Sequence, residues 1–145
     1  MRERTALTAI WLVFFVATLL MVESYVGHPN AAGIAILLDE DRLDALKPLT
    51  ALYGGYLAGI LGFWFARPFK EIENDRARQV RLGIALVCTL VFNVVVLYMV
   101  AREHLAPGGN VINDVDSAVK IAGWLSVVVA PINFYYFGMK APASD

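Results

Sequence analysis

The chain has 145 residues, of which 59% are apolar, and a formal net charge of −1 at pH 7. This apolar share exceeds that of an ordinary soluble domain, and the near-neutral charge gives no basic excess of the kind that binds nucleic acid. The single cysteine, Cys88, excludes a disulfide framework within the chain and a CxxC metal or redox motif.

Four apolar segments, at about 5–26, 48–66, 82–101 and 119–139, each have roughly the length that a membrane-spanning helix needs. They have almost no polar face, which the helices of a soluble protein would require. The sequence therefore predicts an all-α membrane protein, in which residues 1–145 form one bundle of four transmembrane helices. The connecting segments are short and leave no room for a separate catalytic module.

The first segment follows the charged start Met1–Arg4. Its apolar run is too long for a signal peptide and lacks a small-residue cleavage site, which predicts an uncleaved helix that ends near Tyr25–Gly27. His28-Pro29-Asn30 then breaks the helix. The loop 28–47 is acidic, and its apolar residues after Gly33 allow a short helix on the membrane surface or a cap over the bundle.

The second segment, Pro48–Ala66, contains a row of residues with almost no side chain. They recur at steps of three or four, so they share one face of a helix: Ala51, Gly55, Gly59, Gly62 and Ala66. In lipid such a small-residue stripe lets another helix backbone come close, so we expect a helix to pack against it. The opposite face carries Tyr53, Tyr56 and Phe63.

The loop 67–81 has an excess of basic residues, and Ser117 or Asp116 is the expected N-cap of the fourth helix. Cytoplasmic loops are the ones enriched in Lys and Arg, which predicts cytoplasmic termini and acidic loops on the outer side of a bacterial inner membrane. The predicted cytoplasmic side holds two thirds of the basic residues: Arg2, Arg4, Arg67, Lys70, Arg76, Arg78, Arg81 and Lys140. The outer side holds the rest: Arg42, Lys47, Arg102 and Lys120.

Polar residues inside the predicted spans are few. Thr89 and Asn93 share a face of the third helix, and Ser126 and Asn133 share a face of the fourth. Because these helices run antiparallel, we expect the two pairs to lie at similar depths and to form a polar ladder. The ladder either holds the two helices together by hydrogen bonds or lines a hydrated path.

A second polar cluster is expected at the outer face, where the first and third helices end. It comprises Glu23, His28, Glu103 and His104. Two histidines and two carboxylates at one depth could bind a metal, and two histidines could hold a haem. The HxxxH, HExxH and ExxH spacings are absent, so the simpler interpretation is a set of interfacial groups in contact with water, and we expect no cofactor.

The segment Ala130–Lys140, APINFYYFGMK, resembles the end of small bacterial and phage membrane proteins of the holin-like kind, in which an aromatic-rich run finishes the last span before a charged tail. The resemblance implies a self-associating membrane protein that opens a lesion or pore. No functional residue is carried over from it.

The sequence contains no nucleophile, nucleotide-binding or EF-hand motif, so we do not expect an enzyme. The stripe favours a membrane protein that associates with copies of itself and serves as a pore, a channel or a scaffold. The first alternative is a small accessory subunit of a larger membrane redox or transport complex. The second alternative is a membrane protein that binds a metal or a haem.

Overall fold

The computed structural model describes residues 2–29, 33, 35–65, 75–105 and 110–137. These residues form helices and no named strand. The helices are α1 (Arg2–Tyr25), α2 (Arg42–Phe65), α3 (Asp75–Val100), the short α4 (Arg102–Leu105) and α5 (Val111–Phe137). The all-helical prediction is confirmed for the described part of the chain.

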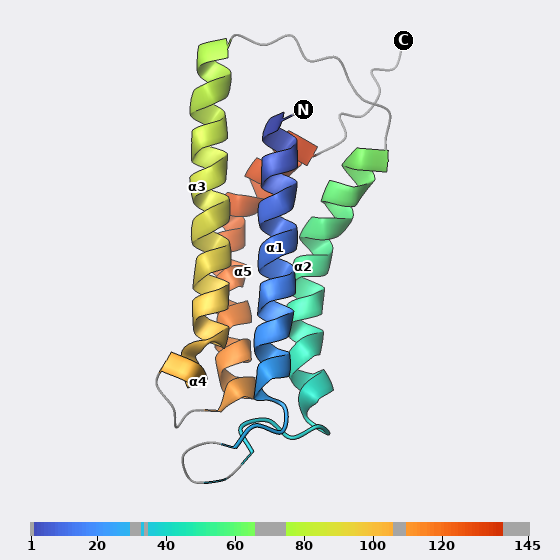
Figure 1. Cartoon of the computed structure of the whole chain (residues 1–145). Coiled ribbons are helices and arrows are strands. Elements are labelled where there is room, and N and C mark those ends of the chain that lie inside the picture. The colour runs from blue at the N-terminus through green and yellow to red at the C-terminus, as the bar shows by residue number, and fades with distance from the viewer. Residues whose placement is uncertain (1, 30–32, 34, 66–74, 106–109, 138–145) are drawn as a thin grey trace.

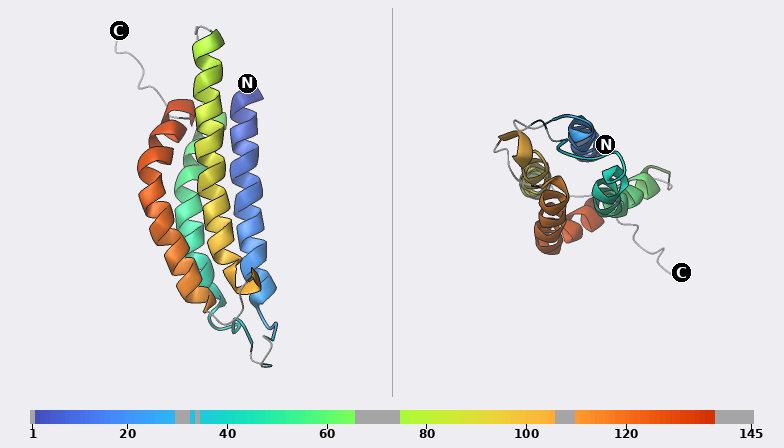
Figure 2. Two further views of the ribbon diagram at one scale, coloured as in Figure 1. Left: turned by 90° about the vertical axis from the view of Figure 1, so that its left-hand side faces the viewer. Right: turned by 90° about the horizontal axis from the view of Figure 1, so that it is seen from below.

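The four long helices lie side by side, and each packs mainly on two neighbours, with a smaller contact between α1 and α5 (Figures 1 and 2). The most extensive contact is between α3 and α5; α5 also packs on α2, α2 on α1, and α1 on α3. The start of α1 and the end of α5 lie at the same end of the molecule, as expected for helices that alternate in direction (Figure 1). At this end α2 leans away from α1 and α3 (Figure 1).

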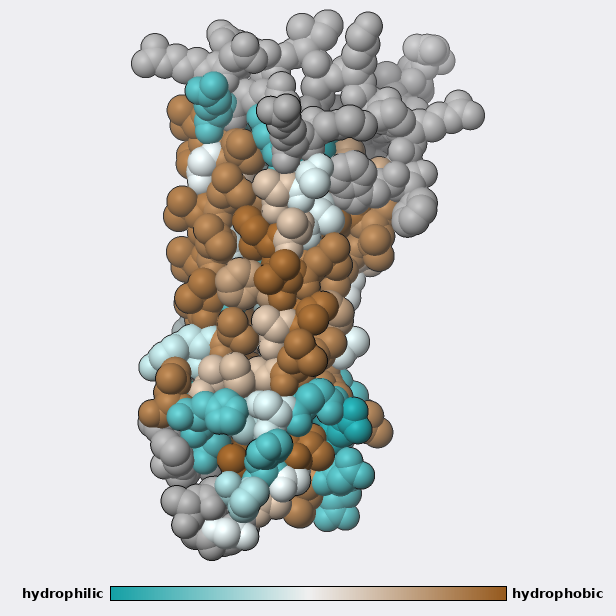
Figure 3. Space-filling view, viewed as in Figure 1, coloured by the Kyte–Doolittle hydropathy of each residue, from teal (hydrophilic) through white to brown (hydrophobic). Residues whose placement is uncertain are grey.

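Within the described residues, three helices are long and apolar enough to cross a membrane: Glu3–Tyr25, Gln79–Val100 and Val111–Phe137. The helix α2 is not among them, because glycines, tyrosines and Pro48 dilute the large aliphatic side chains in its uncharged part. The surface view agrees with this assignment, since an apolar belt covers the middle of the molecule above a hydrophilic end (Figure 3). The structure is therefore compatible with a multi-pass membrane protein.

Three helices begin well before their apolar segments predict, among them α3, which starts at Asp75 rather than at residue 82. The helix α2 starts at Arg42 rather than at Pro48, and α5 starts at Val111 rather than at residue 119. The N-cap of α5 is Asn110, whose side-chain Oδ1 accepts hydrogen bonds from the backbone amides of Ile112 (2.9 Å) and Asn113 (3.3 Å). The prediction of Ser117 or Asp116 as the cap was wrong, because hydrophobicity marks where a helix enters lipid and not where it begins.

In the described part of the loop between α1 and α2, residues that follow α1 form isolated β-bridges with residues that precede α2. Val26 bridges to Leu37, and Pro29 bridges to Ala35. Gly27 has φ of 69°, which a glycine adopts without strain where the chain leaves α1. Leu37 is buried against the helices, so the loop residues that the structure describes close the end of the molecule without forming a helix of their own before α2.

Candidate functional site

The small-residue stripe of α2 faces outward. Ala51, Gly55, Gly59 and Gly62 are exposed, whereas Tyr53 on the opposite face is fully buried. A Cβ atom built on Gly54, Gly55, Gly59 or Gly62 would meet nothing within 4 Å. None of the described helices therefore covers this part of the stripe, and the remaining residue of the prediction, Ala66, lies outside the described residues.

The structure also shows a second row of small residues that the sequence analysis did not separate from the first. Gly54, Ala58 and Gly62 follow one another at steps of four, beside the row of Ala51, Gly55 and Gly59. All six residues are exposed. The bare face of α2 is thus two rows wide.

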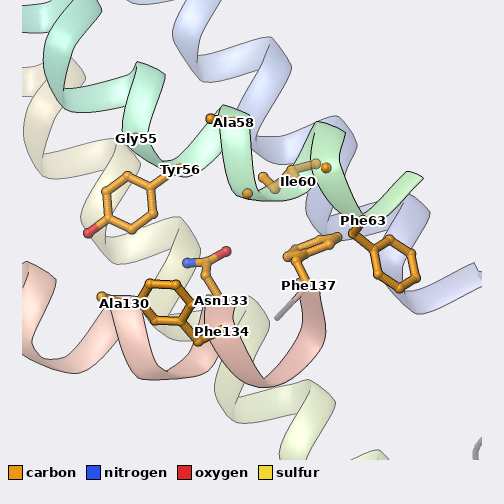
Figure 4. A pocket seen from close by; sticks show the side chains of 11 residues that line it. Gly55, Tyr56, Ala58, Ile60, Phe63, Ala130, Asn133, Phe134 and Phe137 are labelled. Carbon is orange, nitrogen blue, oxygen red and sulfur yellow. The ribbon is translucent and has the colours of Figure 1, made fainter. Parts of the chain in front are cut away.

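A groove of about 590 Å³ lies between this bare face and α5 (Figure 4). Tyr56, Asn133 and Phe137 point into the space between the two helices (Figure 4). The lining is almost entirely apolar: Gly55, Tyr56, Ala58, Gly59, Ile60, Gly62, Phe63, Ala130, Asn133, Phe134 and Phe137. The groove occupies the end of the molecule where α2 leans outward.

Asn133 at the floor of this groove is fixed by two hydrogen bonds. Its Oδ1 accepts from the indole Nε1 of Trp11 at 3.0 Å, and its Nδ2 donates to the carbonyl of Val129 at 3.0 Å. The Trp11 ring stacks on the ring of Tyr56, with centroids 4.4 Å apart. The side chain of Asn133 therefore connects α5 to α1.

The predicted polar ladder between the third and fourth apolar segments has different partners in the structure. Ser126 accepts a hydrogen bond of 2.6 Å from the hydroxyl of Tyr56 on α2, and Asn133 is bonded to Trp11 on α1. Among the described residues, these two α5 side chains are thus hydrogen-bonded to α2 and α1 and not to α3. These two partners, a tryptophan and a tyrosine, could not be predicted from the sequence, because both residue types were counted as apolar or interfacial and not as polar.

Thr89 and Asn93 on α3 are both fully buried. The Nδ2 of Asn93 donates to the carbonyl of Thr89 at 2.8 Å. The Oγ1 of Thr89 and the Oδ1 of Asn93 have no hydrogen-bond partner within the described structure. Their burial was predicted, but their partners across to α5 were not found.

The predicted outer cluster is divided among separate contacts. Glu23 pairs with Arg42 at the start of α2, with 2.8 Å between Nη2 and Oε1. Arg102 lies 3.7 Å from Asp114 on α5. His28 is exposed, and its Nδ1 lies 3.3 Å from the carbonyl oxygen of Val26 in the same loop.

His104 belongs to a contact between α4 and α1. Its ring lies 4.5 Å from the ring of Tyr25, and its Nε2 lies 3.0 Å from the Oγ of Ser24. The Ser24 hydroxyl also donates to the carbonyl of Met21 at 2.6 Å. Tyr25 in turn donates to the carbonyl of Val100 at 2.9 Å, where α3 ends.

Glu103, the remaining member of the cluster, is buried. Within the residues that the structure describes, no group of three or more histidine, cysteine, aspartate and glutamate side chains is arranged to hold a metal ion. The arrangement instead joins α1, α2, α3 and α5 at one end of the molecule, with α4 between them, through ion pairs and hydrogen bonds. The metal or haem alternative stays a prediction, which an absorbance spectrum and a metal analysis of the purified protein would test.

The chain was compared with protein-family models, with curated proteins and with solved structures, and none of them matches it. The functional argument therefore depends on the geometry of the chain itself, and the bare face of α2 with its groove is the candidate site.

Proposed function

We propose that the chain is an integral membrane protein that crosses the bilayer four times and associates with copies of itself through the bare face of α2. Both ends of the chain lie on the cytoplasmic side in this proposal. The uncharged part of α2, residues 48–65, would rise about 27 Å as a helix, close to the roughly 30 Å thickness of a bilayer's hydrocarbon core. This length supports α2 as a fourth span beside the three more apolar helices.

One observation carries the self-association proposal: the glycines of α2 are exposed and have open space where a Cβ would stand. Packing against the described part of the chain therefore does not demand glycine at these positions. Glycine also lowers the stability of a helix relative to alanine. In lipid, small residues allow two helices to approach closely, and the resulting backbone and side-chain contacts drive association. A second copy seated on the row Gly54, Ala58 and Gly62 gives these residues a physical purpose.

Aromatic rings fill the centre of the molecule, which argues against a channel through a single copy. A scaffold of associated copies is therefore favoured over such a channel. Trp11 lies 6.0 Å from Tyr53, 4.4 Å from Tyr56 and 5.3 Å from Phe92 between ring centroids. A pore of the kind that the holin-like resemblance implies would run between copies. Ion flux from liposomes that contain the assembled protein tests this form of the proposal.

The test of self-association is a leucine at Gly54, which lies on the bare face but does not line the groove. Leucine there blocks close approach, so we expect Gly54→Leu to shift the protein from an oligomer toward the 15.9 kDa monomer. The mass is measured by light scattering of protein purified in mild detergent. Gly123→Leu and Gly83→Leu are matched controls, because both glycines are exposed and equally open but lie on α5 and α3.

Two results contradict the proposal: an unchanged oligomer for Gly54→Leu, or a wild-type protein that is monomeric at every concentration.

The accessory-subunit alternative uses the same surface for a different membrane chain. Purification without overexpression separates the two, because a homo-oligomer runs alone, whereas a subunit is recovered with unrelated chains.

A further inference from the structure

Two buried polar atoms on α3 have no hydrogen-bond partner within the described structure. They are the Oγ1 of Thr89 and the Oδ1 of Asn93, and both side chains are fully buried. The two residues are four positions apart and therefore share one face of α3. A buried polar group without a partner is unfavourable, and native proteins seldom leave one unpaired. The pair therefore indicates a hydrogen-bonding group that belongs to the interior of the bundle.

The two oxygens lie within one turn of α3. The Nδ2 of Asn93 donates to the backbone carbonyl of Thr89 at 2.8 Å, so the amide group folds back over the preceding turn. The Oδ1 of the same amide group is held there with it, in the turn where Thr89 carries its hydroxyl. One small molecule can therefore reach both oxygens.

Hydroxyl groups on the neighbouring helices are already engaged elsewhere. The hydroxyl of Thr18 on α1 donates to the carbonyl of Phe14 at 2.7 Å and lies 3.3 Å from the hydroxyl of Tyr53 on α2. On α5, Ser126 donates within its own helix and accepts from Tyr56. Since none of these hydroxyls is bonded to α3, they do not supply the donor that the oxygen of Asn93 requires.

The surroundings of the two oxygens are polar as well as buried. The helices α1 and α3 start at the same end of the molecule and run in the same direction (Figure 1). Toward their other end, the hydroxyl of Tyr25 donates to the carbonyl of Val100. Thr18 and Asn93 each precede that pair by seven residues, which is about two helical turns. Thr18 therefore lies at the level of Asn93, on the side of α1 that faces α3.

Water has the chemistry that this site requires. A water molecule donates two hydrogen bonds, so it can bond to the amide oxygen of Asn93, which only accepts, and also to the hydroxyl of Thr89. Buried waters typically make about three such bonds with groups that would otherwise be unpaired. The span Gln79–Val100 carries no acidic residue, so the site lacks the carboxylates with which proteins usually hold a cation.

We propose that one water molecule is bound inside the bundle, where it bridges the Oδ1 of Asn93 and the Oγ1 of Thr89. Packed rings border this position, since the ring of Phe92 lies 5.3 Å from that of Trp11 and 5.4 Å from that of Tyr56 between centroids. The water is thus an isolated part of the fold and not a section of a continuous channel. The inference goes beyond self-association and does not depend on it, because both residues are buried within one chain.

Water-edited solid-state NMR of the full chain in lipid bilayers tests the proposal. The experiment measures how fast magnetisation passes from water protons to the side-chain nitrogens of protein labelled with nitrogen-15. We expect the Nδ2 of Asn93 to receive it severalfold faster than the Nε1 of Trp11, which is equally buried but bonded to Asn133. Asn113 is exposed and gives the rate of a side chain in full contact with water.

Thr89→Val tests the position of the water. Valine has nearly the shape of threonine but lacks the hydroxyl, so the water loses a partner and the transfer to Asn93 should slow toward that of Trp11. Thr89→Ser keeps a hydroxyl and should retain the fast transfer. Should Thr89→Val not fold, the comparison of Asn93 with Trp11 in the wild type still decides whether water is bound, because it needs no substitution. Gly54→Leu should keep the fast transfer even where it loses self-association, so the two proposals fail separately.

Three results overturn the inference. The first is a transfer to Asn93 in the wild type that is as slow as the transfer to Trp11. The second is an unchanged fast transfer in folded Thr89→Val. The third is a melting temperature that rises in sodium chloride relative to choline chloride for the wild type but not for Thr89→Val, which would make the site one for a cation.

Discussion

At the scale of single residues, the hydrogen bond between Trp11 and Asn133 is the clearest polar contact in the interior. Both side chains are buried, and the bond joins α1 to α5 across 122 positions of sequence. Hydrogen bonds between membrane helices contribute roughly 0.6–2 kcal/mol. Leaving one partner buried and unpaired costs about 1–3 kcal/mol.

We therefore expect Trp11→Phe and Asn133→Leu each to lower the free energy of unfolding, and the double variant to lose less than the sum of the two. The coupling energy should be roughly 0.6–2 kcal/mol, measured by a double-mutant cycle of unfolding in detergent. Trp124→Phe is the control, because Trp124 is 81% exposed on α5. Strictly additive effects of the two single substitutions on the free energy of unfolding would contradict this hydrogen bond.

At the scale of elements, the start of α5 depends on Asn110. Its side chain accepts from two backbone amides that have no partner inside the helix. Asn110→Ala should cost about 1 kcal/mol of stability, whereas Asn110→Ser should retain most of it. Thermal unfolding followed by circular dichroism measures both, with Asn113→Ala as an exposed control in the same turn. Equal losses for Asn110→Ala and Asn113→Ala would argue against the cap.

At the scale of the whole molecule, the question is whether α2 crosses the membrane. Single cysteines at Asp39, Gln79 and Asp116, in a Cys88→Ser background, mark the segments around α2, α3 and α5. With four spans, a membrane-impermeant maleimide added to intact cells should label Asp39→Cys and Asp116→Cys, and should label Gln79→Cys only after lysis. Labelling of residues 39 and 79 from the same side would show that α2 does not cross, since α2 lies between them.

Much of the architecture can be predicted from the sequence, because hydrocarbon penalises exposed polar groups in every arrangement of the helices. Long apolar segments therefore indicate helices whichever neighbours they find. The burial of Thr89, Asn93 and Asn133 could be predicted for the same reason. Helix ends were predicted less well, since Arg42–Lys47 and Val111–Ala118 are helical but carry charges that place them outside an apolar window.

Which side chains meet was decided only by the tertiary structure. Periodicity places residues on a face of a helix, but the rotation and neighbours of that helix depend on packing with the other three. For this reason Asn133 bonds to Trp11 and not to a residue of α3, and Glu23 pairs with Arg42. The glycine row could be read from the sequence, whereas its position beside a groove against α5 follows from the way α2 leans outward from the other helices.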